Sequence, residues 1–501
     1  MGRSTFFSEH QNCKMKKISS EKIVLFVILT VIATIYVFAF SHSTSPMFPY
    51  YYGGDSAQFL TIGKAWYLGK LPYVEMFDHK GPFIFWINML GFVIGNGQKY
   101  GVTLLQVFFM FFSILAFYQI AQLFYKDKIY SYIVVIITLF AMKINYCDGN
   151  TVEEWCIPFI SWSLYGIIRY WKDSAERGHS PKWAFLYGLT LGISFLTRIT
   201  NFLPLCAGVF YIILYLLYKK EYENIIKNVL AGLLGASILI VPFLAYFASK
   251  DALYECIYGT LLYNFEYAEG RKSWLLIANS DDIKQYCFNY FISLSIFITA
   301  FICFVKKEYG WCVLYATAGI LEQFMYLSGD AFTQYPLVCI VQIPILINVV
   351  MGLVYINKPT EKLIMLSSVF ILLVFLSSNM TQMTKTIELK RLFKERKDRG
   401  WEQLLEQIPE NEANRFVAYG GNQFKELYLL DDLMPCYKYF VIQEWQGNLS
   451  TELKTAIHET FATKQAKWIL TDEIVDNIKD ILSESYMLVD NTEKYYLYKL
   501  K

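Results

Sequence analysis

The chain has 501 residues, and its 45 Lys and Arg nearly balance its 43 Asp and Glu, which leaves a formal net charge of +2. This balance does not indicate nucleic acid or a strongly acidic partner. Hydrophobic residues make up 55% of the chain and charged residues only 18%, against about 25% charged in an ordinary globular protein. The composition therefore excludes a wholly soluble protein, and the shortage of charge is concentrated in the first 380 residues.

The first apolar run, residues 23–40, follows a short basic head. No small-residue cleavage site follows the run, and it is long enough to span a bilayer. We therefore expect a retained anchor with residues 1–22 in the cytoplasm, because basic flanks stay on that side. The ten cysteines show no short spacing typical of zinc or redox sites.

Ten further apolar runs precede residue 381. With the first run they predict an α-helical polytopic membrane protein with about eleven transmembrane helices. The runs lie at about residues 101–124, 129–145, 156–171, 183–197, 201–218, 228–247, 288–305, 309–327, 336–356 and 363–380.

Residues 82–95 are also apolar, begin with a proline and end on a glycine. A helix of this length reaches only about 20 Å, short of the ~30 Å hydrocarbon core. If the segment does not cross, thirteen basic residues of five short loops face the cytoplasm and only Arg198 lies in the short loops opposite, as the positive-inside rule requires. We therefore expect an interfacial helix along the outer surface.

This topology makes three outer regions large: residues 41–100, residues 248–287 and everything beyond residue 380. The predicted organisation is a cytoplasmic head (1–22), a transmembrane domain (23–380) with an outer first loop (41–100), and a small extracytoplasmic α/β domain (381–501). In that last domain, ELKRLFKERKDRGWEQLLEQIPENE is typical of a charged helix. RFVAYG, KWILTD, YMLVD and KYYLYKL are typical of short strands.

Ionisable residues gather in the first loop. Asp55 follows two glycines and precedes a helical pattern, so one interpretation is a helix N-cap. Asp78, His79 and Lys80 precede Pro82, and the simplest interpretation is an interfacial turn in which Lys80 extends toward lipid head groups. The other interpretation is a reaction site, since acids can activate a hydroxyl and cations can hold a phosphate.

The second outer loop carries three acids, Asp148, Glu153 and Glu154, and no base. Acids in such a loop can simply cap the helix that begins near Trp155. Together with the first loop and Arg198, however, they place acids and cations on one face of the membrane.

The order of four motifs resembles the GT-C glycosyltransferases, most closely bacterial relatives of protein O-mannosyltransferases and lipid A aminoarabinose transferases. The motifs are G-D-S-A at Asp55, D-H-K-G-P at Asp78, N-T-V-E-E-W at Glu153 and F-L-T-R-I-T-N at Arg198. The resemblance covers about residues 20–380 and implies a sugar transferred, with inversion, from a polyprenyl-phosphate donor to an envelope glycan, lipid or protein on the outer face.

The resemblance also implies residue roles. Asp55 would accept the proton of the acceptor or orient its hydroxyl, and Glu153 or Glu154 would be an additional acid; the choice between the two stays open. The donor would be contacted by residues Asp78, His79, Lys80, Arg198 and Tyr335, among which Lys80 and Arg198 would neutralise its phosphate.

Two positions depart from the family pattern. Many relatives carry a second acid directly after the first-loop aspartate, where this chain has Ser56, so no metal site is assigned and a role for a divalent ion stays open. Relatives also often show a His-Tyr pair before a late span, where this chain has Gln334-Tyr335.

The alternatives are a transporter or flippase for a lipid-linked sugar, a glycan polymerase or ligase of another fold, and a non-catalytic partner in envelope assembly. A transporter predicts charges near the bilayer midplane, and few spans carry one. The richness in Phe, Tyr, Ile and Lys favours a bacterium of low G+C content, and hence a multi-pass plasma-membrane protein that uses undecaprenyl phosphate as carrier.

Overall fold

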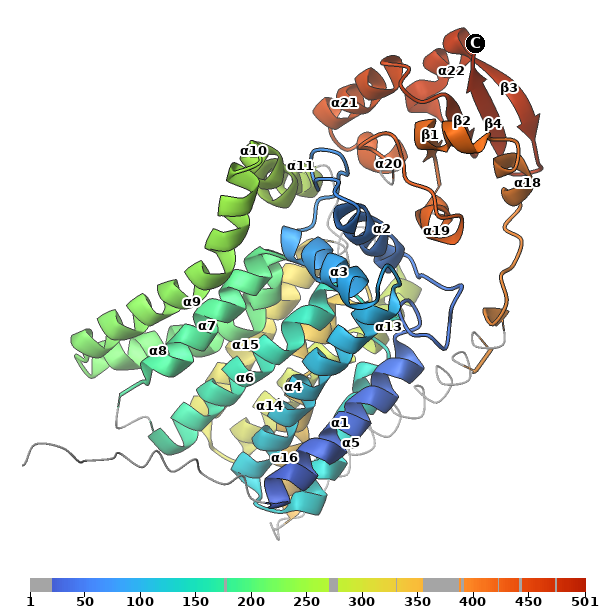
Figure 1. Cartoon of the computed structure of the whole chain (residues 1–501). Coiled ribbons are helices and arrows are strands. Elements are labelled where there is room, and N and C mark those ends of the chain that lie inside the picture. The colour runs from blue at the N-terminus through green and yellow to red at the C-terminus, as the bar shows by residue number, and fades with distance from the viewer. Residues whose placement is uncertain are drawn as a thin grey trace, which may run out of the picture.

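The computed structural model describes residues 20–174, 178–269, 278–329, 331–354, 387–388, 392–421, 423–440, 444–473 and 475–501. A bundle of helices forms the larger part, and a small α/β unit lies at one end of it (Figure 1). The fold is mostly helical, as the sequence predicts.

Within the described residues, ten helices coincide with ten of the predicted apolar runs. They are α1 (Ser20–Phe40), α4 (Tyr100–Phe124), α5 (Lys128–Met142), α6 (Val152–Arg169), α7 (Pro181–Phe195), α8 (Leu203–Tyr218), α9 (Tyr222–Ala248), α14 (Phe291–Val305), α15 (Tyr309–Ser328) and α16 (Gln342–Val354). The eleventh run, 363–380, lies outside the described residues.

By length and composition, four helices of the described chain can cross a membrane: α1, α4, α9, and α8 together with the short η3 (Ile199–Phe202) that precedes it. A fifth is available if α13 (Ser280–Asn289) and α14, which meet at a 76° bend, count as one span. Several remaining helices are shorter than the ~30 Å hydrocarbon core of a bilayer. An example is α5, which has 15 residues at a rise of about 1.5 Å each. The count of eleven spans stays a prediction.

Two short helices of the first loop (residues 41–100) lie at the end of the bundle that faces the α/β unit (Figure 1). They are α2 (Asp55–Tyr67) and α3 (Pro82–Ile94). The helix expected over 82–95 is therefore confirmed, with Pro82 in its first turn and Gly95 as its C-cap; its place at the membrane surface stays a prediction. Beyond α9, the chain continues at the same end through α10 (Leu253–Ile257), η4 (Tyr258–Leu262) and α11 (Tyr263–Glu269).

The C-terminal unit (residues 402–501) contains a four-stranded sheet, in its described part, of order β1-β2-β4-β3. The strands are β1 (Phe416–Tyr419), β2 (Trp468–Thr471), β3 (Tyr486–Asn491) and β4 (Tyr496–Leu500), so all four predicted strands are confirmed. β1 runs parallel to β2 with Phe416 opposite Trp468, and the other pairs are antiparallel.

The helical segments of this unit complete the fold around the sheet. They are α18 (Glu402–Leu405), η6 (Glu410–Arg415), α19 (Phe424–Leu430), α20 (Glu444–Gly447), α21 (Thr451–Ala462), η7 (Asp476–Ile478) and α22 (Lys479–Ser485).

The charged helix predicted before the sheet, over residues 388–412, is interrupted in its described part. Residues 394–401 form no helix, and regular structure resumes only at α18. All six residues from Lys394 to Arg399 are charged, so the segment has no apolar stripe to bury against a neighbour. Gly400 then adopts φ +89°, which an α-helix cannot include.

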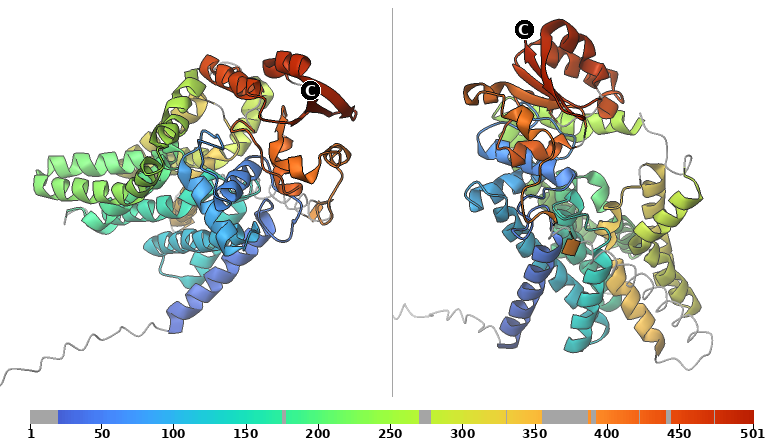
Figure 2. Two further views of the ribbon diagram at one scale, coloured as in Figure 1. Left: turned by 45° about the horizontal axis from the view of Figure 1, so that its top comes forward. Right: turned by 90° about the vertical axis from the view of Figure 1, so that its right-hand side faces the viewer.

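The C-terminal unit is attached to the first loop. Lys64 of α2 forms an ion pair with Asp432, and Lys70 Nζ donates a hydrogen bond to the carbonyl of Pro435 at 3.3 Å. The backbone N–H of Phe77 donates to the carbonyl of Lys438 at 2.9 Å. Both views of Figure 2 show this unit over the end of the bundle that carries the first loop.

Helices α7 and α9 approach so closely that two of their contacts leave no room for a side chain. A Cβ on Gly188 would lie 1.9 Å from the carbonyl oxygen of Gly232, and one on Gly235 would lie 2.1 Å from that of Phe185. Small residues allow this kind of helix contact in membranes, where dispersion replaces the hydrophobic effect as the attraction between helices.

We predict that Gly188→Val lowers the stability of the bundle, because backbone blocks the position of the new side chain; overpacking of this kind typically costs about 1–3 kcal/mol. The measurement is the thermal unfolding midpoint in detergent. Gly310→Val is the matched control, because a Cβ on Gly310 meets no atom of the described chain within 4 Å. Equal midpoints for the two variants would contradict the prediction.

Candidate active site

Asp55 is the first residue of α2 and does not cap it. Gly54 occupies the N-cap position, and within the described chain no side chain caps this helix, so the N-cap interpretation is wrong. The side chain of Asp55 is 52% exposed, and Lys425 Nζ of α19 lies 3.5 Å from its Oδ1. The carboxylate is therefore accessible, beside a cation and the positive end of a helix.

Asp78 is buried and shapes the turn before α3. Its Oδ1 accepts a hydrogen bond from the backbone N–H of Lys80 at 3.0 Å, and Gln58 Nε2 donates to its Oδ2. Burial raises the pKa of the Asp78 carboxyl above its usual value, while the charge of Lys80 opposes that rise. Because the carboxylate accepts bonds from the turn itself, Asp78 holds the position of Lys80.

His79 packs against the outer region that follows α9. Its ring stacks on Tyr267 with centroids 5.2 Å apart, and Asn264 Nδ2 donates to the His79 carbonyl at 2.9 Å. Its Nε2 is also within hydrogen-bonding distance of Lys80 Nζ. The imidazole is therefore placed between the first loop and α11.

Lys80 lies among four other charges. Burial lowers the pKa of Lys80, the carboxylates of Asp78, Asp55 and Glu153 raise it, and the guanidinium of Arg198 lowers it further. These five side chains, Asp55, Asp78, Lys80, Glu153 and Arg198, are the charge cluster. Lys80 does not behave as a surface lysine that simply extends toward lipid head groups.

A close backbone contact joins Lys80 to Arg198. The N–H of Gly81 donates to the carbonyl of Thr197 at 3.0 Å, and the N–H of Phe83 donates to that of Leu196 at 3.0 Å. A Cβ on Gly81 would lie 2.3 Å from the carbonyl carbon of Leu196. Only glycine permits this approach, which brings two motifs far apart in the sequence to one place.

Arg198 is held between an acid and an aromatic ring. Its Nη1 donates to Glu153 Oε1 at 3.2 Å, and its guanidinium carbon lies 3.3 Å from the ring centroid of Tyr335. The side chain of Glu153 is 1% exposed and that of Arg198 22%. Tyr335, in η5 (Tyr335–Cys339), therefore lies against Arg198 of the charge cluster, and its contact with the donor stays a prediction.

Glu154 points elsewhere. Its carboxylate accepts hydrogen bonds from Gln106 Nε2 at 2.8 Å, from the N–H of Asn150 at 2.6 Å and from the hydroxyl of Tyr146. Asp148 likewise is bound by His42 Nδ1 at 2.6 Å and by the Tyr51 hydroxyl at 2.7 Å. Of the acids in the second loop, Glu153 is the one that faces Arg198.

Sequence reasoning missed Lys425. A lysine in a small α/β unit looks like an ordinary surface charge, and the sequence carries no signal that places it beside Asp55. Ser56, where relatives carry a second acid, is buried and accepts a hydrogen bond from Asn150 Nδ2 at 2.9 Å. Within the described ranges, no group of three or more His, Cys, Asp or Glu is arranged to hold a metal ion.

Residues 79–278 match the family described as dolichyl-phosphate-mannose-protein mannosyltransferase. The match includes His79, Lys80, Glu153 and Arg198 and begins after Asp55. No curated protein sequence matches the chain.

Among solved structures, the chain is similar to ArnT from Cupriavidus metallidurans bound to undecaprenyl phosphate. The alignment covers 96% of this chain and 98% of ArnT, with 12% sequence identity and a TM-score of 0.57. A second match is the oligosaccharyltransferase AglB from Archaeoglobus fulgidus in complex with an inhibitory peptide and a dolichol-phosphate. The alignment covers 93% of this chain and 70% of AglB, with 11% sequence identity and a TM-score of 0.46. The chain therefore has the fold of ArnT, and its residues 79–278 match a mannosyltransferase family, in agreement with the resemblance drawn from the sequence motifs.

Proposed function

We propose that the chain transfers a sugar from a polyprenyl-phosphate donor to an acceptor hydroxyl on the outer face of the plasma membrane. The observation that carries the proposal is the charge cluster, in which two cations and three acids from three separate segments meet. The family match over residues 79–278 supports it, as does the ArnT structure, which is described as bound to undecaprenyl phosphate.

Lys80 and Arg198 would bind the donor phosphate. A guanidinium offers a planar fork of donors and an ammonium a compact point charge, and both form charge-assisted hydrogen bonds with phosphate oxygens. Without donor, Glu153 balances Arg198. The phosphate would share or replace that pairing, so its negative charge enters a site where the counter-charges are already in position.

Asp55 would act as the general base. It takes the proton of the acceptor hydroxyl while the hydroxyl oxygen attacks the anomeric carbon from the face opposite the phosphate. The bond between that carbon and the phosphate oxygen breaks, its electrons leave with the polyprenyl phosphate, and the configuration inverts. Lys80 and Arg198 stabilise the departing phosphate, and Lys425 orients the carboxylate of Asp55.

A transporter of a lipid-linked sugar is the second candidate, and one observation favours it. Glu322 of α15 is fully buried, and its Oε2 has no hydrogen-bond partner in the described part of the chain, although Gln342 Nε2 donates to its Oε1 at 2.6 Å. Buried acids in membrane helices commonly belong to ion or proton pathways.

We predict that Asp55→Asn lowers turnover about a hundred- to ten-thousand-fold, the usual contribution of general-base assistance. The thermal midpoint should not change, because an exposed ion pair contributes at most about 1 kcal/mol. The measurement uses full-length protein in nanodiscs with a panel of polyprenyl-phosphate sugars and follows donor consumption.

Asp432→Asn is the matched control for Asp55→Asn, since it removes a second ion pair between the first loop and the C-terminal unit. Wild-type turnover in Asp55→Asn would contradict the assignment of the base. Net movement of donor across the bilayer without turnover, abolished by Glu322→Gln, would favour the transporter.

We predict different effects for the two neighbouring glutamates. Glu154→Gln places an amide N–H₂ where hydrogen-bond donors already converge, which leaves a buried group unsatisfied at a cost of about 1–3 kcal/mol. We expect its unfolding midpoint to fall, while the protein that remains folded keeps its turnover. Glu153→Gln weakens the balance of charge at Arg198, so turnover per folded molecule falls. Turnover normalised to folded protein separates the two, and the reverse pattern would show that Glu154 is the functional acid.

We predict an early alkaline loss of donor binding. Since burial lowers the pKa of Lys80, the ammonium that binds phosphate is present below that lowered pKa and is lost as pH rises through it. Lys80→Arg keeps its charge to higher pH, because an arginine is not deprotonated in proteins. Donor affinity measured against pH should therefore fall later in Lys80→Arg, and identical profiles would contradict phosphate binding by Lys80.

A further inference from the structure

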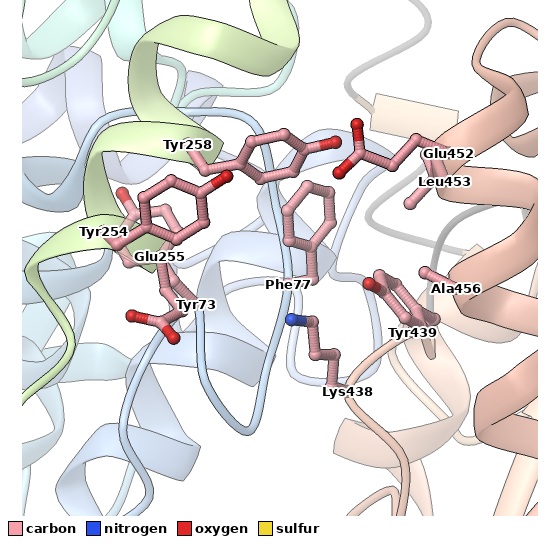
Figure 3. A pocket seen from close by; sticks show the side chains of 10 residues that line it. All are labelled: Tyr73, Phe77, Tyr254, Glu255, Tyr258, Lys438, Tyr439, Glu452, Leu453 and Ala456. Carbon is pink, nitrogen blue, oxygen red and sulfur yellow. The ribbon is translucent and has the colours of Figure 1, made fainter.

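A separate cavity lies between the first loop and the C-terminal unit. Its volume is about 180 Å³. Figure 3 shows the segments around it: Tyr73 and Phe77 from the first loop, the helix of α10 and η4, and α21 with the chain before it. These segments are joined, because the Phe77 N–H donates to the Lys438 carbonyl at 2.9 Å and the Ser450 hydroxyl donates to Glu266 at 2.7 Å. The cavity is therefore bounded by contacts of the folded chain and is open to solvent on one side.

Aromatic rings form two sides of the cavity. The rings of Tyr254 and Tyr258 are stacked, with centroids 6.2 Å apart and planes 22° from parallel. Phe77 packs between Tyr258 and Tyr439, with its ring centroid 6.3 Å from the first and 5.5 Å from the second. Tyr254 is 66% exposed, so its ring is available at the rim. An aromatic face carries partial negative charge and attracts C–H groups of partial positive charge.

Carboxylates and one ammonium complete the lining. Glu255 Oε2 is buried and has no hydrogen-bond partner among the described residues, so the cavity offers an unused acceptor. In Figure 3 the carboxylate of Glu452 and the hydroxyl of Tyr258 point toward one another. Lys438 Nζ lies 5.2 Å from the ring centroid of Tyr439 and supplies donors. The lining therefore joins apolar faces with polar groups of both kinds.

A sugar ring matches this combination. One face of a pyranose presents C–H groups, and its edge presents hydroxyls that donate to carboxylates and accept from an ammonium. The volume of about 180 Å³ corresponds to about six waters at ~30 Å³ each, which is room for one sugar ring rather than for a longer glycan. We propose that this cavity binds one saccharide ring of a glycan acceptor, held against Tyr254 and Tyr258 with its hydroxyls on Glu255 and Glu452.

The acceptor, rather than the donor, is the source of this ring. Two carboxylates and one ammonium disfavour a phosphate-linked sugar, whereas the charge cluster supplies Lys80 and Arg198. The two sites are adjacent, since Phe77 precedes Asp78 and the Tyr73 hydroxyl donates to the Lys80 carbonyl at 2.6 Å. A glycan bound in the cavity would thus extend past the first loop toward Asp55. This inference rests on the proposed function for its assignment of the acceptor.

The test measures binding of free oligosaccharides to full-length protein in nanodiscs, without donor. The probes are oligomers of β-1,4-glucose, β-1,4-N-acetylglucosamine, α-1,6-mannose and β-1,3-galactose, followed by saturation-transfer NMR at their ring protons. We expect binding of at least one oligomer, weakened about tenfold or more in Tyr254→Ala and in Glu452→Gln, because loss of one such contact is worth about 1.4 kcal/mol.

A control away from both sites makes the result decisive. Tyr218→Ala removes a tyrosine that is 79% exposed at the end of α8 and should leave binding unchanged. No binding to any oligomer, or equal binding in wild type and both cavity variants, would overturn the proposal. Oligosaccharide binding that depends on Tyr254, in a protein that consumes no polyprenyl-phosphate sugar, would instead overturn the proposed function and leave a glycan-binding site.

Discussion

The ion pair between Arg198 and Glu153 is the constraint on which the rest of the site depends. A buried charge without a partner costs several kcal/mol, so the start of α6 and the break after α7 must meet. Tyr335 covers the guanidinium from η5, and Gly81 ties the turn that carries Lys80 to Thr197 beside it. Segments that are distant in sequence are therefore positioned by one pair of charges.

Much of the fold could be predicted from the sequence, because long apolar runs indicate membrane helices and alternating apolar residues indicate short strands. The choice between Glu153 and Glu154 was not readable, because neighbours on a helix point about 100° apart and only tertiary contacts show which one meets Arg198. Lys425 was hidden for a similar reason: no local pattern links α19 to Asp55. The expected helix before the sheet failed where residues 394–401 offer charge but no apolar stripe.

The first loop is shared by two neighbouring environments of opposite character. Its turn at Asp78 and Lys80 faces charges of both signs, while Tyr73 and Phe77, only a few residues earlier, face aromatic rings. The hydrogen bond from the Tyr73 hydroxyl to the Lys80 carbonyl crosses between them. A displacement of this loop would therefore change the charge cluster and the aromatic cavity together. A molecule bound in one of them is thereby coupled to the geometry of the other.

The contact between Lys425 and Asp55 has a consequence for biogenesis. Asp55 leaves the ribosome early, and Lys425 follows only after roughly tens of seconds at about 5–20 residues per second. Until then, α2 lacks α19, and the Phe77 N–H lacks the Lys438 carbonyl that it binds in the finished protein. The helices of the bundle are therefore synthesised before the contacts around Asp55 and Phe77 are complete, and a chain released without its last residues would lack those contacts.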